Sequence, residues 1–293
     1  MNASLHLLWR RFCCDTGNMT ERVSCTITDG VADVRLNRAD KMNALDGAMF
    51  AALSETGEAL KHDRSLRAVV LSGEGRAFCA GLDFASFGAM ASGNPGSVVP
   101  LPRDGSDDPS ILPGKITHSG QQAAWVWQEI PVPVIAAVHG VALGGGCQIA
   151  LGADIRIAAP DAKFSVLEIR WGLIPDMTGT QTLIRLVGLD VAKELTFTGR
   201  MVSGEEAVAL GLATRVSTDP LADALAMAHE IAGRSPHAVR AGKRLLNMAG
   251  EGTIAEGFRA ERMEIGALIG SPNQVEAVTA FFEKRPARYA DPA

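Results

Sequence analysis

Short runs of apolar residues recur along the first two thirds of the chain and predict β-strands. Residues 23–27 and 31–36 are β-prone, and Asp29-Gly30 between them is typical of a hairpin turn. Further short apolar runs are too brief for helices and predict buried strands. These runs are residues 67–72, 133–138, 155–158 and 163–166.

Helical spacing of apolar residues appears between these strands and dominates the end of the chain. Asp46 is placed to cap a helix that runs to about Lys61. We expect further helices at about 115–129, 144–151, 222–232, 237–249 and 256–269, and a last one that starts at Ser271-Pro272 and ends near 284. Strands alternate with helices to about residue 217, so we predict an α/β core followed by a helical region.

Two segments do not follow either pattern. Residues 88–114 are rich in Gly, Pro, Ser and Asp and predict a long loop, which in a compact domain is usually functional or mobile. In the first 18 residues Arg10 and Arg11 follow the apolar stretch, whereas a signal peptide has its charges before it. We interpret 1–18 as an extension, with the fold beginning near Met19; weak membrane contact is the alternative.

Composition narrows the class of protein. Hydrophobic residues make up 47% and charged residues 21% of the 293 residues, which is typical of a globular protein. A net charge of −5 gives no reason to expect a nucleic-acid partner. Residues 130–153 lack charged side chains, but two prolines and several glycines argue against a membrane helix, so we expect no membrane partner. The five cysteines form no C-x-x-C pair, which favours a reducing, cytoplasmic location.

The strongest local motif is Gly144-Gly145-Gly146, which lies between a predicted buried strand and a predicted helix. Glycines there let a ligand approach the backbone, and the first amides of a helix are unpaired donors. Such amides stabilise a developing oxyanion. The segment matches neither G-x-x-x-x-G-K-[ST] nor G-x-G-x-x-G. Tight strand–helix packing is the alternative explanation for the three glycines.

A second segment, residues 76–83 (RAFCAGLD), would by itself indicate only a turn between a strand and a helix. Together with the glycine segment it resembles the paired oxyanion-hole loops of the crotonase superfamily, also called the enoyl-CoA hydratase/isomerase family. The similarity extends from about residue 23 to 288. Its further matches are Leu36-Asn37-Arg38, Asn43-Ala44-Leu45, Ala153-Asp154-Ile155-Arg156, Gly172-Leu173-Ile174-Pro175, Thr198-Gly199-Arg200, residues 207–212 and residues 281–285.

This resemblance implies a fold and a division of the chain. The expected fold is an α/β spiral of ββα units with a C-terminal α-helical trimerisation region. The expected divisions are an extension at 1–18, a core at 19–217 that carries the active site, and a helical region at 218–293. The family also implies a homotrimer, or a hexamer built as a dimer of trimers. No cofactor is expected beyond the coenzyme A of the substrate, and the six His and five Cys show no metal-ligand spacing.

The resemblance also implies roles for individual residues. The backbone N–H groups of Leu82 and Gly145 would bind the oxygen of an acyl-CoA thioester. The remaining candidates fall into a substrate-binding group and a CoA-binding group, and for the basic side chains a solvated surface charge is the alternative. The substrate-binding candidates are Ala80, Asp83, Gly144 and Gln148, and the CoA-binding candidates are Arg38, Lys41 and, from a neighbouring subunit, Lys284.

The acid–base residues decide which reaction is expected. Hydratases of this family carry two glutamates, but here the first position is Gln148, whose amide can orient a water or substrate and cannot act as a base. The second position is Glu168, in an apolar run that favours a raised pKa, although a surface charge at a strand end is the alternative. Asp176 follows at the spacing of the Glu–Asp pair in the dienoyl-CoA isomerase branch; a helix N-cap is its alternative role.

We therefore expect Glu168 and Asp176 to move a proton along the acyl chain, which makes double-bond isomerisation the favoured reaction. Hydration of a 2-trans-enoyl-CoA by Glu168 alone is one alternative. A catalytically reduced acyl-CoA-binding subunit is another, because the isomerase branch has an acidic residue where this chain has Gln148. A nucleophilic hydrolase is a third, but Ser165, Cys147 and Cys79 lack a His–Asp partner in recognisable order.

Overall fold

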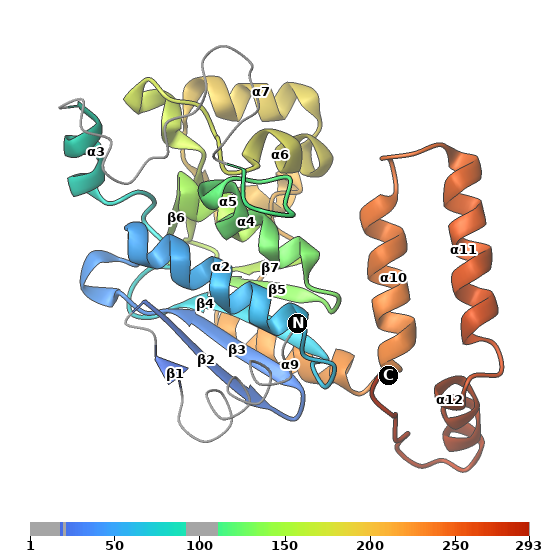
Figure 1. Cartoon of the computed structure of the whole chain (residues 1–293). Helices are drawn as coiled ribbons and strands as arrows, with labels where there is room; N and C mark the ends of the chain where they lie inside the picture. Colours follow the sequence, from blue (N-terminus) through green and yellow to red (C-terminus); the bar gives the residue numbers. More distant parts are fainter. Residues whose placement is uncertain (1–17, 20–21, 92–110, 293) are drawn as a thin grey trace.

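The computed structural model describes residues 18–19, 22–91 and 111–292 (Figure 1). Its main sheet has the order β1-β2-β3-β4-β5-β7-β10, and a second, three-stranded sheet has the order β6-β8-β9. The strands are β1 (Asn18–Met19), β2 (Val23–Thr28), β3 (Val31–Leu36), β4 (Ala68–Gly73), β5 (Val134–Val138), β6 (Val141–Leu143), β7 (Ile155–Ala158), β8 (Lys163–Ser165), β9 (Val202–Ser203) and β10 (Arg215–Val216). All six predicted strands are confirmed, while β1, β6, β9 and β10 were not predicted.

The main sheet begins with the predicted hairpin. β2 and β3 pair antiparallel, and Asp29 and Gly30 in the turn both have positive φ, 50° and 77°. Two successive positive φ values match the twist of a two-residue hairpin, which explains the Asp-Gly sequence. From β3 through β4, β5 and β7 to β10 every neighbouring pair is parallel, so helices must cover both faces of this part.

Alternate residues of the central strands enter two separate cores. Val69 and Leu71 of β4 pack with α2 (Gly47–Lys61) and α4 (Ser119–Glu129), whereas Ala68 and Val70 pack with α9 (Pro220–Ala232). Figure 1 shows α2 above the sheet and α9 below it. The sequence-based division assigned residues 218–232 to the C-terminal region, but α9 covers the sheet and belongs with the core. The helices that stand apart begin at α10.

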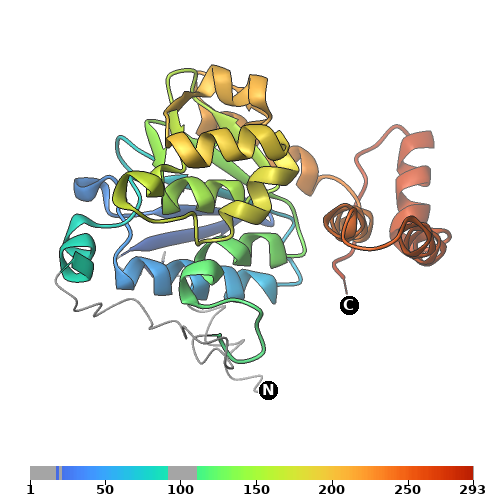
Figure 2. The ribbon, with the colours of Figure 1, turned by 90° about the horizontal axis from the view of Figure 1, so that it is seen from above.

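Shorter helices connect the strands, and those between residues 145 and 210 gather around the small sheet (Figure 2). The shorter helices are η1 (Ala39–Lys41), α3 (Phe84–Ala91), α5 (Gly145–Leu151), η2 (Leu167–Trp171), α6 (Gly179–Val187), α7 (Leu189–Thr198) and α8 (Gly204–Leu210). The strand predicted at 163–166 ends at Ser165, and the chain then turns into the 3-10 helix η2. Glu168 is therefore on a helical turn and not at a strand end.

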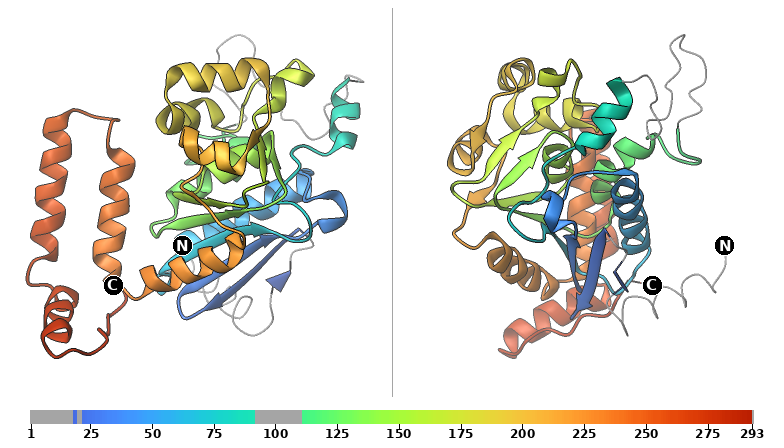
Figure 3. Two further views of the ribbon diagram at one scale, coloured as in Figure 1. Left: turned by 180° about the vertical axis from the view of Figure 1, so that it is seen from behind. Right: turned by 90° about the vertical axis from the view of Figure 1, so that its left-hand side faces the viewer.

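The last three helices, α10 (Pro236–Met248), α11 (Ile254–Leu268) and α12 (Pro272–Phe282), stand beside the core (Figures 1 and 3). Ser271 caps α12 through the Gln274 amide, as its place before Pro272 predicted. α11 buries none of its side chains, and Phe258 and Met263 on it are 55% and 71% exposed. An exposed apolar face of this size is typical of an interface between subunits.

A buried cation holds α10 against the core. The Lys243 Nζ lies 2.7 Å from the Asp154 Oδ2 and donates to the carbonyl oxygens of Trp127 and Val132, at 3.2 and 3.0 Å. The Lys243 residue is only 8% exposed, and burial lowers its pKa. Three protein groups thus meet at one ammonium, which fixes where the C-terminal helices leave the core.

No helix in the described ranges is long and apolar enough to cross a membrane. The uncharged segment 130–153 divides into β5, β6 and α5, as its prolines and glycines suggested. Within the predicted loop 88–114, α3 continues to Ala91, and residues 92–110 lie outside the described residues. The same holds for residues 1–17 of the predicted extension.

Candidate active site

The segment 79–83 runs between two other parts of the backbone and is fixed by both. On one side Leu45 N donates to Gly81 O at 2.8 Å, and Asp83 N donates to Leu45 O at 2.9 Å. Successive amides of an extended segment point in opposite directions, so the N–H of Leu82 faces away from Leu45. On the other side the Leu143 amide of β6 donates to Cys79 O at 3.0 Å. The Leu82 amide is thereby directed to the side of β6 and the helix that follows it.

Glycines let the two loops touch. Gly81 has a φ of +88°, and a Cβ there would lie 2.6 Å from the carbonyl oxygen of Leu143. Gly145 begins α5, so its N–H belongs to the unpaired first turn. Within the described part of the chain, neither the Leu82 nor the Gly145 amide donates a hydrogen bond to the protein. The two loops that carry these amides are therefore in contact, as the proposed oxyanion hole requires.

Gln148 is completely buried and all of its amide hydrogen bonds run to other parts of the protein. Its Oε1 accepts from the amides of Met177 and Gly179, at 2.8 and 2.9 Å, and its Nε2 donates to the Glu168 Oε1 at 2.6 Å. These contacts fix the orientation of the Gln148 amide, since only the oxygen can face two N–H groups. Gln148 therefore positions Glu168 and the turn before α6, a role that its assignment as a substrate-binding residue did not include.

Glu168 is buried, at 8% exposure, which excludes the surface-charge alternative. One of its oxygens is held by Gln148, and within the described chain its Oε2 has no hydrogen-bond partner. A Cβ on Gly144 would lie 3.4 Å from the Glu168 Oε1, so the carboxyl adjoins the glycine loop. Burial raises the pKa of Glu168, the nearby charge of Asp176 raises it further, and the hydrogen bond from Gln148 opposes the shift.

Asp176 lies close to Glu168 and does not cap a helix. The residue before α6 is Thr178, with a φ of 72° and no side-chain capping bond, so the N-cap alternative for Asp176 is wrong. The Asp176 side chain is accessible to solvent, but enough protein surrounds it for desolvation to raise its pKa. His118, which the sequence reasoning missed, opposes this rise electrostatically.

His118 has a fixed place at the start of α4. Its Nδ1 accepts hydrogen bonds from the amides of Gly120 and Gln121, at 3.1 and 3.4 Å. The neutral ring consequently carries its proton on Nε2. Gln121 completes a capping box by bonding back to the His118 amide, and this H-x-x-Q spacing was the signal available in the sequence.

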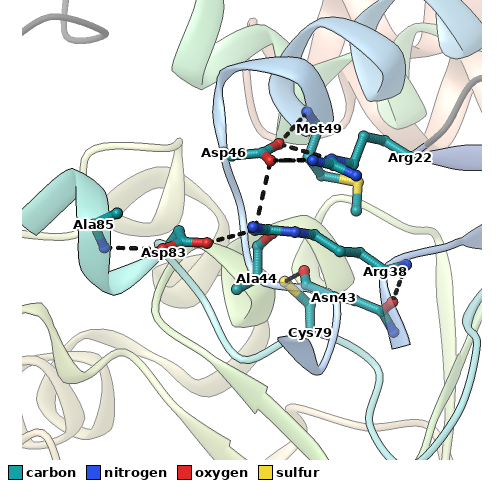
Figure 4. Close-up of polar contacts among 9 residues, drawn as sticks. All are labelled: Arg22, Arg38, Asn43, Ala44, Asp46, Met49, Cys79, Asp83 and Ala85. Atoms are coloured by element: carbon teal, nitrogen blue, oxygen red, sulfur yellow. Dashed lines mark hydrogen bonds and ion pairs between the residues drawn. The ribbon is translucent and has the colours of Figure 1, made fainter. Parts of the chain in front are cut away.

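Arg38 and Asp83 form an ion pair beside the oxyanion loop (Figure 4). The Arg38 Nη1 lies 2.6 Å from the Asp83 Oδ2 and 3.5 Å from the Asp46 Oδ2, and it donates to Ala44 O at 3.0 Å. The Ala85 amide and then Arg38 lower the pKa of Asp83. Both side chains are thus occupied by the protein itself, which argues against Arg38 as a CoA ligand and Asp83 as a substrate ligand. Asp83, which directly follows Leu82, instead anchors the end of the oxyanion loop to Arg38.

Asn43 fixes the start of the same loop and was missed as a separate functional residue. Its Nδ2 donates to the carbonyl oxygens of Ala77 and Phe78, at 2.8 and 3.2 Å, and its Oδ1 accepts from the Arg38 amide at 2.8 Å. The side chain is fully buried. One amide side chain therefore ties the loop to the same arginine that holds Asp83.

The remaining candidates occupy different places. Ala80 directly precedes Gly81, and its amide donates to Met42 O at 2.9 Å. Lys41 is exposed at the end of η1, near enough to Asp83 to help lower the pKa of that carboxyl. Lys284 is exposed just beyond α12, in the C-terminal helices that Figure 1 shows beside the core at the end away from α3. Lys41 is the CoA candidate that the chain itself brings to the site.

The nucleophile candidates named from the sequence, which all lie in the described residues, are not activated as in a hydrolase. Burial raises the pKa of both Cys79 and Cys147 to about 12, so both thiols stay protonated at neutral pH. The Ser165 hydroxyl donates to Gly199 O at 3.1 Å, and His139 Nε2 contacts Gly75 O at 2.9 Å. Among the described residues, no group of His, Cys, Asp and Glu could hold a metal ion.

Known proteins are similar to this chain in sequence and in fold. A family model described as enoyl-CoA hydratase/isomerase matches residues 26–97 and 114–292. Mitochondrial methylglutaconyl-CoA hydratase of Mus musculus is 34% identical over 267 residues, covering 89% of this chain and 79% of the relative. Short-chain-enoyl-CoA hydratase of Clostridium acetobutylicum is 33% identical over 258 residues, covering 87% and 92%. The crystal structure of enoyl-CoA hydratase from Bacillus anthracis superposes with a TM-score of 0.79 at 30% identity, covering 92% and 98%.

Proposed function

The chain belongs to the enoyl-CoA hydratase/isomerase family, and we propose that within this family it isomerises a double bond of an enoyl- or dienoyl-CoA. The observation that carries the proposal is the arrangement of three side chains. At the first acid–base position Gln148 has no acidic proton to give and is hydrogen-bonded to Glu168. The second carboxyl near Glu168 is Asp176. The pair available for proton transfer is therefore Glu168 and Asp176.

The reaction would proceed through a thioester enolate. One carboxylate removes a proton from C2 of the acyl chain, and the electrons of that C–H bond delocalise onto the thioester oxygen. The amides of Leu82 and Gly145 are positioned to stabilise that oxygen, and one such donor is typically worth about 3–4 kcal/mol in the transition state. The other carboxyl returns a proton at C4 of an enoyl chain or C6 of a dienoyl chain, so atoms and charge balance.

Two features of the carboxyls support this scheme. Burial raises the pKa of both Glu168 and Asp176, which brings each closer to the pH at which a group can both take and give a proton. Their environments nevertheless differ, because Glu168 is buried against Gln148 while Asp176 is open to solvent and near His118. Two carboxyls in different environments separate into an acid and a base.

Hydration of a 2-trans-enoyl-CoA is the second candidate function. It is favoured by the names of the relatives, which are hydratases in mouse, Clostridium and Bacillus. In this chain the hydration would rely on Glu168, since Gln148 cannot donate an acidic proton to the enolate. The unpartnered Oε2 of Glu168 is the atom that would hold the attacking water.

Side-by-side turnover of a 3,5-dienoyl-CoA and a 2-trans-enoyl-CoA separates the two candidates. We expect isomerisation to be faster, and we expect both Asp176→Asn and Glu168→Gln to reduce it by at least about 100-fold, as for loss of a catalytic acid or base. Asp161→Asn, at an exposed aspartate outside the site, is the matched control and should leave turnover unchanged. Fast hydration that is insensitive to Asp176→Asn would exclude the isomerase proposal.

A further inference from the structure

Two aromatic side chains meet at the surface next to the candidate active site. The rings of Phe84 and Trp171 have centroids 6.0 Å apart and an interplanar angle of 77°, which is an edge-to-face contact. Phe84 is 76% exposed and Trp171 is 46% exposed in the isolated chain. The two residues come from different elements, α3 and η2, so the contact joins segments far apart in sequence.

Each ring belongs to a residue that is close in sequence to a candidate site residue. Phe84 follows Asp83, which directly follows the oxyanion residue Leu82. Trp171 lies three residues after Glu168 in the 3-10 helix η2, and side chains three apart eclipse in such a helix. Trp171 and Glu168 consequently share one face of η2. The aromatic pair therefore spans from the loop that would hold the thioester oxygen to the carboxyl that would act on the chain.

Exposed apolar side chains follow Trp171 in the chain and lead to Asp176. Between Trp171 and Asp176, Leu173 and Ile174 are 43% and 67% exposed. The segment 167–177 contains one cation, Arg170, which lies one position away from the Trp171 face and adjoins Gly199. Clustered exposed apolar side chains of this kind mark a binding site for an apolar group.

We propose that Phe84 and Trp171 select the acyl group, favouring apolar chains and rejecting acyl groups that end in a carboxylate. The apolar chain would lie against the two rings and remove them from water. An acyl carboxylate would instead meet the charge of Asp176, and Arg170, the one Lys or Arg of the segment 167–177, lies off the Trp171 face. This inference rests on the proposed function for the position of the thioester, but it concerns the choice of substrate and not the reaction.

Binding of unreactive saturated acyl-CoAs tests the inference independently of turnover. Isothermal titration would compare octanoyl-CoA with butanoyl-CoA for chain length, and pentanoyl-CoA with glutaryl-CoA for a terminal carboxylate at equal carbon number. We expect the wild type to prefer octanoyl- and pentanoyl-CoA by at least about tenfold, which corresponds to about 1.4 kcal/mol. Phe84→Ala and Trp171→Ala should each reduce the octanoyl preference to below about threefold.

Phe197→Ala provides the matched control. Phe197 is an equally exposed phenylalanine, at 68%, on α7, whose end adjoins Leu167 and Ile169 and not the Trp171 face. It should leave both preferences unchanged, and light scattering would establish that every variant assembles as the wild type does. Unchanged preferences in Phe84→Ala and Trp171→Ala would overturn the inference, as would glutaryl-CoA binding as tightly as pentanoyl-CoA. Absence of isomerase turnover would affect only the proposed function.

Discussion

Replacing Gln148 by glutamate would test how the protein controls the protonation of Glu168. The Nε2 of Gln148 lies 2.6 Å from the Glu168 Oε1, so Gln148→Glu brings two carboxyl oxygens into contact. Two unit charges about 4 Å apart repel by about 4 kcal/mol at an effective dielectric constant of about 20. That energy corresponds to about three pKa units. The two carboxyls would therefore share one proton at neutral pH and titrate as a coupled pair.

The assay is kcat/KM for isomerisation as a function of pH in the wild type and in Gln148→Glu. In the direction in which Glu168 is the base of the proposed pair, it acts only when ionised, so kcat/KM rises with pH through its pKa. Burial already raises that pKa in the wild type. In Gln148→Glu the rising limb of the kcat/KM profile should move to higher pH by at least about one pH unit. Activity at pH 7 should be at least about tenfold lower and should recover as the pH increases.

A second buried glutamine supplies the control. Gln122 on α4 is 1% exposed and its Nε2 donates to Glu58 and Glu129, so Gln122→Glu also places a carboxyl beside carboxylates. That change should lower stability and leave the rising limb where it is in the wild type. The reasoning is refuted if Gln148→Glu folds normally and its limb coincides with that of the wild type, because Gln148 would then have no influence on Glu168.

Three further outcomes follow from contacts in the fold. Lys243→Met should lower the free energy of unfolding in urea by about 3 kcal/mol, since it leaves the half-buried Asp154 carboxylate and two carbonyl oxygens without their ammonium partner, whereas Arg244→Ala, at an exposed ion pair, should cost less than about 1 kcal/mol. Glu168 takes up a proton on folding, because its pKa is higher in the folded state. Stability is therefore greatest below the pKa of Glu168 in the unfolded chain, about 4.3, and falls as the pH rises through the folded-state pKa. Glu168→Gln should raise Tm at pH 7 and not at pH 4. Gly81→Ala should reduce kcat at least about 100-fold by displacing the oxyanion loop, whereas Gly88→Ala, which meets open space, should not.

The parts of the fold that sequence predicted well are those in which local chemistry decides. Asp29-Gly30 suits a turn with two positive φ values whatever surrounds it, and the hairpin is where it was expected. Asp46 and Ser271 accept hydrogen bonds from amides three residues on, so each marks its own helix start. The strands β9 and β10 have two residues each and exist because of partners elsewhere in the chain, and no local pattern identifies them.

The site shows the same division between local and distant causes. The positions of Leu82 and Gly145 could be predicted from the glycines beside them. Only glycine lets the two backbone segments come as close as Gly81 and Leu143 do. The hydrogen bonds of Gln148 could not be predicted from sequence, since the amides that donate to it lie 29 and 31 residues away. Arg38 looked available for coenzyme A because its partner Asp83 is 45 positions later. Charges that are paired through the fold look unpaired in the sequence.

Unsatisfied and strained groups concentrate at one end of this site, and that end is where the chemistry belongs. In the described chain only four buried side-chain atoms lack a hydrogen-bond partner, and two of them are the Glu168 Oε2 and the Thr178 Oγ1. Thr178 is β-branched yet has a φ of 72°, which is costly for such a residue. A buried orphan acceptor costs about 1–3 kcal/mol. The Arg38–Asp83 ion pair, by contrast, has its hydrogen bonds satisfied, so it holds the loop in place, whereas the proposed reaction would use the unpartnered Oε2 of Glu168 to take a proton from the substrate.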